Sequence, residues 1–221
     1  MTGATALLVI DMQRDFLDPQ GYIARSGVDV TPLRGIIPQV RRLLAAARAA
    51  GITVVHTREG HRTDLADLNA AKRRRAAGVG AAIGSAGPLG RLLVRGEPGH
   101  DIIPELAPHP GETVIDKPGF GAFYATDLDS ILRVAEVSTL VIAGVTTDIC
   151  VHSTLREAVD RGFECTTVSD ACAAGDASIH AAMLACISGE GGILGRVAST
   201  DQVIAAWTAT ANPVVTGAPA G

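Results

Sequence analysis

Residues 138–168 decide the fold and read STLVIAGVTTDICVHSTLREAVDRGFECTTV. Apolar runs at residues 139–143 and 165–168 flank residues 149–161, whose apolar positions follow helical spacing. Both runs are nearly continuous in apolar and β-branched residues, which is typical of parallel strands that are covered on both faces. The stretch therefore predicts a strand, a helix and a second strand in one parallel sheet.

The same pattern continues on both sides of this unit. Further strands are predicted at residues 6–10, 52–56 and 113–115, and further helices at residues 31–51, 127–136 and 177–188. The alternation predicts a three-layer α/β/α fold with a doubly wound, mostly parallel, Rossmann-like sheet. In such a sheet the ligand site lies at the carboxyl ends of the strands.

One domain is predicted over residues 1–208, with an insert at residues 58–112 and a disordered tail at residues 209–221. The insert is rich in glycine and proline, and long loops of this kind serve as lids, binding loops or contact surfaces. It carries a basic run at residues 72–75. By itself this run indicates a solvated face or an intersubunit patch rather than an anion site.

Composition narrows the range of partners. The formal net charge of −4 and the isoelectric point near 5.8 leave no broad basic surface, so neither nucleic acid nor an anionic membrane is an expected partner. No apolar stretch is long enough to span a bilayer. A small molecule is the expected partner, and the lack of a secretory signal pattern in the first residues predicts a cytoplasmic location.

Cysteine and histidine spacing gives no sign of a metal or disulfide framework. The four cysteines show no CxxC spacing, which predicts free thiols in a reducing compartment. His56, His61 and Asp64 form one conceivable metal cluster, but the remaining histidines are scattered without ligand spacing. We therefore expect neither a metal nor a cofactor.

Three chemically active side chains follow predicted strands or open a predicted helix. Asp11 follows the first strand, Lys117 follows the strand at 113–115, and Cys150 lies at the start of the helix at 149–161. A helix N-terminus and a nearby ammonium group both lower the pKa of a thiol, which predicts a nucleophilic thiolate at neutral pH. The other three cysteines are expected to be small buried hydrophobic residues.

Three segments together resemble the isochorismatase-like cysteine hydrolases: LLVIDMQRDFLDPQGYIA at 7–24, VIDKPGFGAF at 114–123 and AGVTTDICVHSTLREAVDRGFEC at 143–165. The resemblance implies a catalytic triad of Asp11, Lys117 and Cys150, a thioester intermediate, and Phe16 in the substrate pocket. It also implies an oxyanion hole made by the backbone N–H groups of Thr146 and Cys150, with a cis peptide bond before Thr146. Members of this family assemble, so a homodimer or homotetramer is expected, with contacts from the insert.

Within the family, the segments HTREGHRTDLADL, RGEPGHDIIPEL and FYATDLDSIL are similar to the branch of biuret hydrolase and ureidoacrylate amidohydrolase. Biuret hydrolase-like sequences have KPGKG and MQGG where this chain has KPGFG and GEGG. These exchanges predict that biuret is a poor substrate. We expect aromatic residues to hold a bulkier amide and Glu190 to pair with a cationic group of a substrate such as a streptothricin-type lactam. The aromatic residues are Phe16, Phe120, Phe123 and Tyr124.

The sequence therefore predicts a cysteine-dependent amidohydrolase that cleaves an amide, ureido or lactam bond of a small molecule. Three alternatives remain open: a biuret or ureidoacrylate hydrolase proper, a streptothricin-type lactam hydrolase, and a binding protein that keeps the fold without the chemistry. The intact triad argues against the last. An oxidoreductase is disfavoured because the glycine fingerprint of dinucleotide-binding sheets is missing after the first strand.

Overall fold

A six-stranded parallel sheet forms the centre of the computed structural model, which describes residues 3–211. Every neighbouring pair of strands in this sheet runs parallel. The strand order is β5-β2-β1-β6-β7-β8, so the chain winds outward from β1 in one direction and from β6 in the other, which confirms the doubly wound fold. The strands are β1 Ala4–Ile10, β2 Thr53–Glu59, β5 Thr113–Lys117, β6 Val137–Val145, β7 Glu164–Ala173 and β8 Arg196–Ala198.

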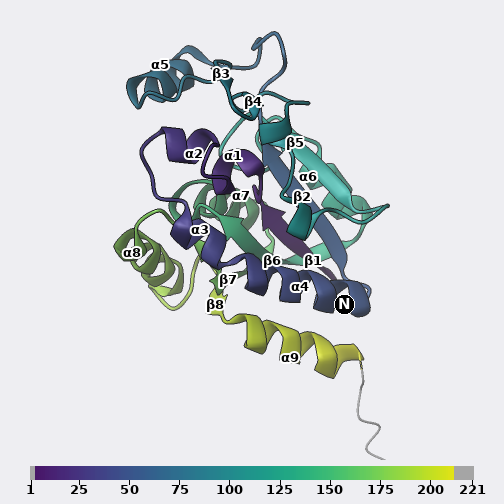
Figure 1. Ribbon diagram of the computed structural model, residues 1–221. Helices are drawn as coiled ribbons and strands as arrows, with labels where there is room; N and C mark the ends of the chain where they lie inside the picture. Colours follow the sequence, from purple (N-terminus) through teal and green to yellow (C-terminus); the bar gives the residue numbers. More distant parts are fainter. Residues whose placement is uncertain (1–2, 212–221) are drawn as a thin grey trace, which may run out of the picture.

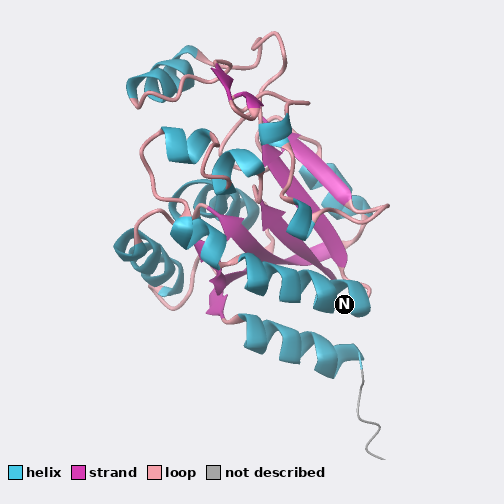
Figure 2. Ribbon diagram, viewed as in Figure 1, coloured by secondary structure: helices cyan, strands magenta, loops and turns pink. Residues whose placement is uncertain are grey.

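Helices cover both faces of the sheet, as Figures 1 and 2 show. One apolar cluster joins the sheet to the helices α3, α4 and α9, and a second joins it to α6, α7 and α8. The helices of the first group are α3 Thr31–Gly35, α4 Ile37–Ala49 and α9 Thr200–Ala211. Those of the second group are α6 Leu128–Val134, α7 His152–Asp160 and α8 Ala177–Ser188.

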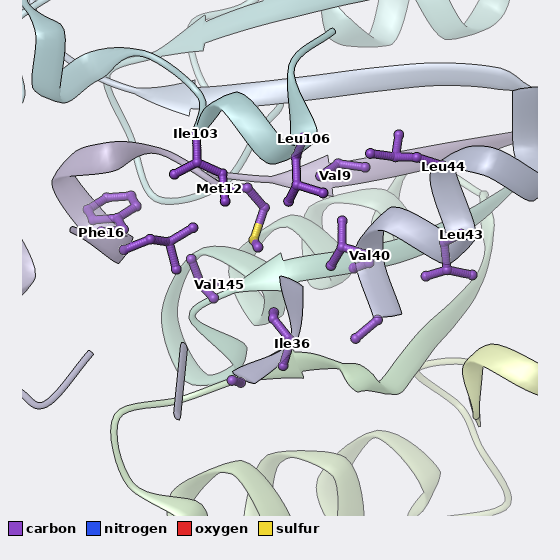
Figure 3. Packing of buried hydrophobic residues seen from close by; sticks show 14 of the residues in the cluster. Val9, Met12, Phe16, Ile36, Val40, Leu43, Leu44, Ile103, Leu106 and Val145 are labelled. Carbon is purple, nitrogen blue, oxygen red and sulfur yellow. The ribbon is translucent and has the colours of Figure 1, made fainter. Parts of the chain in front are cut away.

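Helix α4 shows how the sequence produces this layering. Its buried residues Val40, Leu43, Leu44 and Ala47 recur at the spacing of one helix face. Figure 3 shows Val40 and Leu44 beside Val9 of β1 in the first cluster. The opposite face of α4 carries arginine and glutamine, which stay in contact with solvent.

Among the predicted boundaries that differ from the structure, those of one helix and of the tail have a clear physical reason. The helix expected over residues 31–51 is two helices, because Pro38 is accepted only in a first helical turn and therefore begins a new helix. Helix α9 continues to Ala211, so residues 209–211 of the expected tail are helical, and residues 212–221 lie outside the described residues. The packing of Val203 and Trp207 into the first cluster holds this alanine-rich helix against the sheet.

Short elements stand at the carboxyl ends of the strands. After β1 the chain forms α1 Arg14–Leu17 and α2 Tyr22–Arg25. The insert after β2 forms α5 and a small antiparallel ribbon of β3 and β4, at the top of Figure 1. Its elements are α5 Ala70–Gly78, β3 Ala86–Gly87, β4 Gly90–Arg91 and the 3-10 turns η1 Pro98–His100 and η2 Pro104–Leu106. Among the described residues, no helix is long and apolar enough to cross a membrane.

A pair of substitutions in α6 tests the assignment of the second apolar layer. Leu132 is fully buried, whereas Val134 is 86% exposed on the same helix. Leu132→Ala should lower the free energy of unfolding by about 2–5 kcal/mol, because it leaves a cavity under the helix. Val134→Ala should change it by less than about 0.5 kcal/mol. Urea unfolding followed by circular dichroism measures both, and equal effects of the two substitutions would contradict this packing.

Candidate active site

A cavity of about 200 Å³ opens at the carboxyl ends of the central strands, where the doubly wound sheet predicts a ligand site. Most of its wall is apolar, and of its three charged lining residues Glu59 and Lys72 are buried at the floor, whereas Arg75 is exposed at the mouth. One stripe of α5 contributes Lys72, Arg75 and Ala76, and Val79, which caps the end of the helix, continues their spacing of i, i+3, i+4 and i+7. The lining residues are Phe16, Tyr22, Ile23, Glu59, Lys72, Arg75, Ala76, Val79, Phe120, Thr146, Ile149 and Cys150.

A buried ion pair lies below the cavity. Asp11 directly follows β1, Lys117 ends β5, and both side chains are fully buried. The Lys117 Nζ atom lies 2.7 Å from Asp11 Oδ2. The other Asp11 oxygen accepts a hydrogen bond of 2.6 Å from the Thr57 hydroxyl of β2. Side chains of β2 and β5, which are neighbours in the sheet, thus hold the Asp11 carboxylate in one orientation.

Cys150 approaches this pair from β6. The peptide bond between Val145 and Thr146 is cis, which confirms the prediction, and a π-helical turn, η3 Thr147–Val151, follows it and leads into α7. The Cys150 side chain is 4% exposed, and its Sγ atom lies within 4.8 Å of an Asp11 carboxylate oxygen. The structure therefore brings the three residues of the predicted triad together. Thr146 lines the same cavity.

Two charged residues of the floor were missed by the sequence analysis. Glu59 ends β2 as the parallel neighbour of Lys117, and its Oε2 atom accepts a hydrogen bond of 3.3 Å from the Cys150 thiol. Its Oε1 atom lies 2.5 Å from the Lys72 ammonium. A polar residue at the end of an apolar strand was the signal for Asp11 and Lys117, and it applies to Glu59 once the strand is extended beyond His56.

Lys72 corrects the interpretation of the basic run. It is buried, and it also donates a hydrogen bond of 2.8 Å to the Pro118 carbonyl oxygen. Its ammonium lies 5.1 Å from the centre of the Phe120 ring. The other three residues of the run, Arg73, Arg74 and Arg75, are exposed. A run that looks uniform in sequence is divided by the helix into one buried cation and three at the surface.

The electrostatics of the floor favour a protonated thiol. Burial raises the pKa of Cys150 well above its usual value, and the neighbouring Asp11 and Glu59 carboxylates add to this effect while Lys117 opposes it. The prediction of a resting thiolate is therefore wrong, because desolvation and two carboxylates outweigh one ammonium group in their effect on the pKa of Cys150. Burial likewise raises the pKa of Asp11, against the influence of Lys117.

The residues predicted to bind substrate are divided between the cavity and other places. Phe16 and Phe120 line the cavity. Phe123 is buried against Phe163 at a ring distance of 5.8 Å, because its backbone N–H is bound by a glutamate of α7. Tyr124 is 59% exposed and Glu190 is exposed in the loop after α8, and neither belongs to the lining.

The conceivable histidine cluster does not form a site among the described residues. His56 pairs with Glu112, whereas His61 pairs with Asp67. Asp64 is exposed beside Arg62. The one cluster of potential ligands within residues 3–211 is Asp11, Glu59 and Cys150, and both of its carboxylates already face lysine ammonium groups. These lysines supply the positive charge that a cation would otherwise bring.

The cysteines outside the site also depart in part from expectation. Cys165 and Cys172 are buried, as expected of small hydrophobic residues, whereas Cys186 is exposed on α8. The four thiols are free.

The isochorismatase domain family matches residues 5–202. The chain belongs to this family. It is 33% identical over 217 residues to the ureidoacrylate amidohydrolase RutB of Methylobacterium radiotolerans, with 90% of this chain and 79% of that protein covered. It is 36% identical to RutB of Methylorubrum extorquens, with 76% of this chain and 69% of that protein covered. These relatives and the family indicate a hydrolase that acts on carbon–nitrogen amide bonds.

Solved structures of the family share the fold over nearly the whole chain. A cysteine hydrolase from Pseudomonas syringae pv. phaseolicola 1448A superposes with a TM-score of 0.80 at 29% identity, and the match covers 94% of this chain and 93% of that one. An isochorismatase family protein from Desulfovibrio vulgaris gives a TM-score of 0.75 at 30% identity. The match covers 92% of this chain and 99% of that one.

The raised pKa of Cys150 has a consequence for its reactivity. Iodoacetamide reacts with thiolates, so at pH 7 without substrate it should modify the exposed Cys186 at least about tenfold faster than the buried Cys150. Modification of Cys150 should increase as the pH rises above 9. Peptide mass mapping after timed labelling measures both rates in one sample. Faster labelling of Cys150 than of Cys186 at pH 7 would show that the resting thiol is ionised.

Proposed function

We propose that this isochorismatase family member hydrolyses an amide or ureido bond through a thioester on Cys150. The observation that carries the proposal is the meeting of one thiol with the Asp11–Lys117 ion pair at the floor of a cavity. A thiol next to a carboxylate base and a fixed ammonium has the parts that nucleophilic acyl transfer requires. The intact triad of Asp11, Lys117 and Cys150 argues against a protein that only binds small molecules.

The first half of the reaction forms the thioester and releases an amine. The Cys150 sulfur attacks the carbonyl carbon while its proton passes to the Asp11 carboxylate. Negative charge gathers on the carbonyl oxygen, which the backbone N–H groups of Thr146 and Cys150 would stabilise. As the carbon–nitrogen bond breaks, Asp11 returns the proton to the departing nitrogen. Lys117 keeps the carboxylate oriented in both steps.

The second half restores the enzyme. A water molecule attacks the thioester carbon and gives one proton to Asp11, and the carbon–sulfur bond breaks. The sulfur then takes the proton back from Asp11, so the thiol and the carboxylate return to their starting states. The products are an acid and an amine, or carbamate and an amine when the substrate is a ureide. The expected homodimer or homotetramer and the cytoplasmic location stay predictions.

Substitution of the nucleophile and its base tests the mechanism. Cys150→Ala should abolish amide hydrolysis, and Asp11→Asn should reduce kcat by a factor of about 10² to 10⁴, since it removes the acid and base of both steps. Asp129→Asn on the exposed side of α6 is the matched control and should keep wild-type turnover. Ammonia or amine release gives the rates, and intact mass after acid quenching detects the acyl-enzyme. Turnover by a folded Cys150→Ala variant would refute the mechanism.

The charges at the cavity mouth favour a substrate with an anionic group. Arg75 lines the cavity, and within the described residues no carboxylate pairs with its guanidinium. The one acidic residue of the lining, Glu59, already faces Lys72. Glu190, which was expected to attract a cationic substrate, lies outside the cavity. We infer that the substrate is a ureido or amido acid. Ureidoacrylate, the substrate named for the related enzymes, has a carboxylate for Arg75 and a ureido group for Cys150.

A comparison of neighbouring arginines tests this substrate class. Arg75→Met should raise KM for ureidoacrylate about tenfold or more, because it removes a charge-assisted hydrogen bond, and should leave KM for the methyl ester nearly unchanged. Arg74→Met removes the same charge from an exposed position outside the lining and is the control. Steady-state kinetics with both compounds, and with biuret and a cationic lactam for comparison, measure the effect. Equal losses in the two variants, or a preference for the cationic lactam, would contradict an anionic substrate.

A further inference from the structure

Glu59 contacts the sulfur atom that the proposed function makes the nucleophile. The carboxylate is 3% exposed and has a separate partner on each oxygen. Its Oε2 atom accepts a hydrogen bond of 3.3 Å from the Cys150 thiol, and its Oε1 atom lies 2.5 Å from the Lys72 Nζ atom. The Lys117 ammonium lies 3.6 Å from Oε2. The mechanism above gives a task to Asp11 and none to this second carboxylate.

The charges at the floor balance only when the thiol is neutral. Asp11 and Glu59 contribute two negative charges, and Lys117 and Lys72 contribute two positive charges. A thiolate on Cys150 would add a third negative charge in a place that is almost fully buried. Uncompensated charge is costly in such surroundings. The set of side chains is therefore matched to a thiol at rest.

The two carboxylates are not equivalent. Both oxygens of Asp11 are held by β2 and β5, through the Thr57 hydroxyl and the Lys117 ammonium. Glu59 faces two ammonium groups, which hold its pKa below the usual value in spite of its burial, whereas burial raises the pKa of Asp11. Paired acids whose environments differ in this way divide their roles, with one taking up the proton and the other staying ionised.

We propose that Glu59 is a second catalytic carboxylate, which keeps the Cys150 thiol protonated and oriented between turnovers and leaves proton removal to Asp11. The proposal rests on the cysteine mechanism given above. During attack on the substrate, the proton moves from sulfur to Asp11 while negative charge moves to the carbonyl oxygen. The thiolate then never accumulates beside Glu59. Lys72 keeps Glu59 ionised, so helix α5 of the insert contributes to the reaction at the carboxyl ends of the strands.

The other titratable groups around Glu59 do not duplicate this role. Burial and the carboxylates of Glu59 and Asp15 raise the pKa of Tyr22, on α2, to about 12, so its hydroxyl stays neutral. Burial and the charge of Lys72 lower the pKa of His61, which follows β2. The charged partners of Glu59 are therefore the two lysines, and Asp11 is the second acid of the site.

The test measures the pH midpoint of Cys150 alkylation by iodoacetamide, with Cys186 in the same sample as the reference. Glu59→Gln removes the charge with little change of shape and should lower the midpoint by about one pH unit or more. Glu59→Asp keeps the charge and should retain a midpoint near that of the wild type. Glu112→Gln is the matched control, because this carboxylate is also held by a basic side chain, Arg48, but it precedes β5, at the end of the strand away from Lys117. It should leave the midpoint unchanged.

A double variant covers the risk that Glu59→Gln fails to fold with Lys72 unpaired. Glu59→Gln/Lys72→Met removes both charges and should also lower the midpoint, because the carboxylate touches the sulfur while the ammonium sits on its far oxygen. An unchanged or higher midpoint in whichever of these variants is folded overturns the proposal. The result is independent of turnover: activity in Cys150→Ala would refute the cysteine mechanism, whereas an unmoved midpoint would refute only the role of Glu59.

Discussion

The buried contact between Lys117 and Asp11 is the interaction on which the rest of the site depends. A lysine that is fully enclosed keeps its charge only if anions surround it, and removal of one partner from such a pair typically costs about 3–5 kcal/mol. The two residues come from strands separated by β2 in the sheet, so the parallel register must be correct before they meet. The fold and the chemistry are thereby tied to one contact. The sheet cannot shift by a residue without leaving both charges unpaired.

The sequence predicted that Asp11, Lys117 and Cys150 meet because the signals for these three residues are local. Asp11 and Lys117 each stand at the end of an apolar strand, and parallel strands end on the same edge of a sheet. Cys150 stands at the first turn of a helix that follows another such strand. The placement of these three residues at one edge of the sheet and the layered fold followed from hydrophobic pattern and chain order, whereas their roles as a triad came from the family resemblance. The family resemblance supplied the cis peptide bond before Thr146, which no pattern of residues would have indicated.

The remainder of the site depends on tertiary contacts that a linear pattern does not contain. Lys72 looks like its three arginine neighbours in sequence, and only the orientation of α5 separates it from them. Phe123 follows Phe120 by three residues, yet its backbone is bound to α7 and its ring points into the core. The prediction that Cys150 is ionised at rest was wrong for the same reason. The sequence indicated the ammonium and the helix N-terminus but not the burial or the second carboxylate that outweigh them.

The residues of α5 that line the cavity differ in how freely they can be substituted. Lys72 is bound to Glu59 at the reaction centre, while Arg75 and the C-cap residue Val79 are exposed at the cavity and Ala76 lines it from the first apolar cluster. This stripe therefore contains one residue held by the reaction centre and three that shape the cavity wall. New substrate preferences can arise by exchange of these three positions without any change in the sheet. A small combinatorial library over α5 is thus the natural starting point for redirecting this hydrolase to other amides.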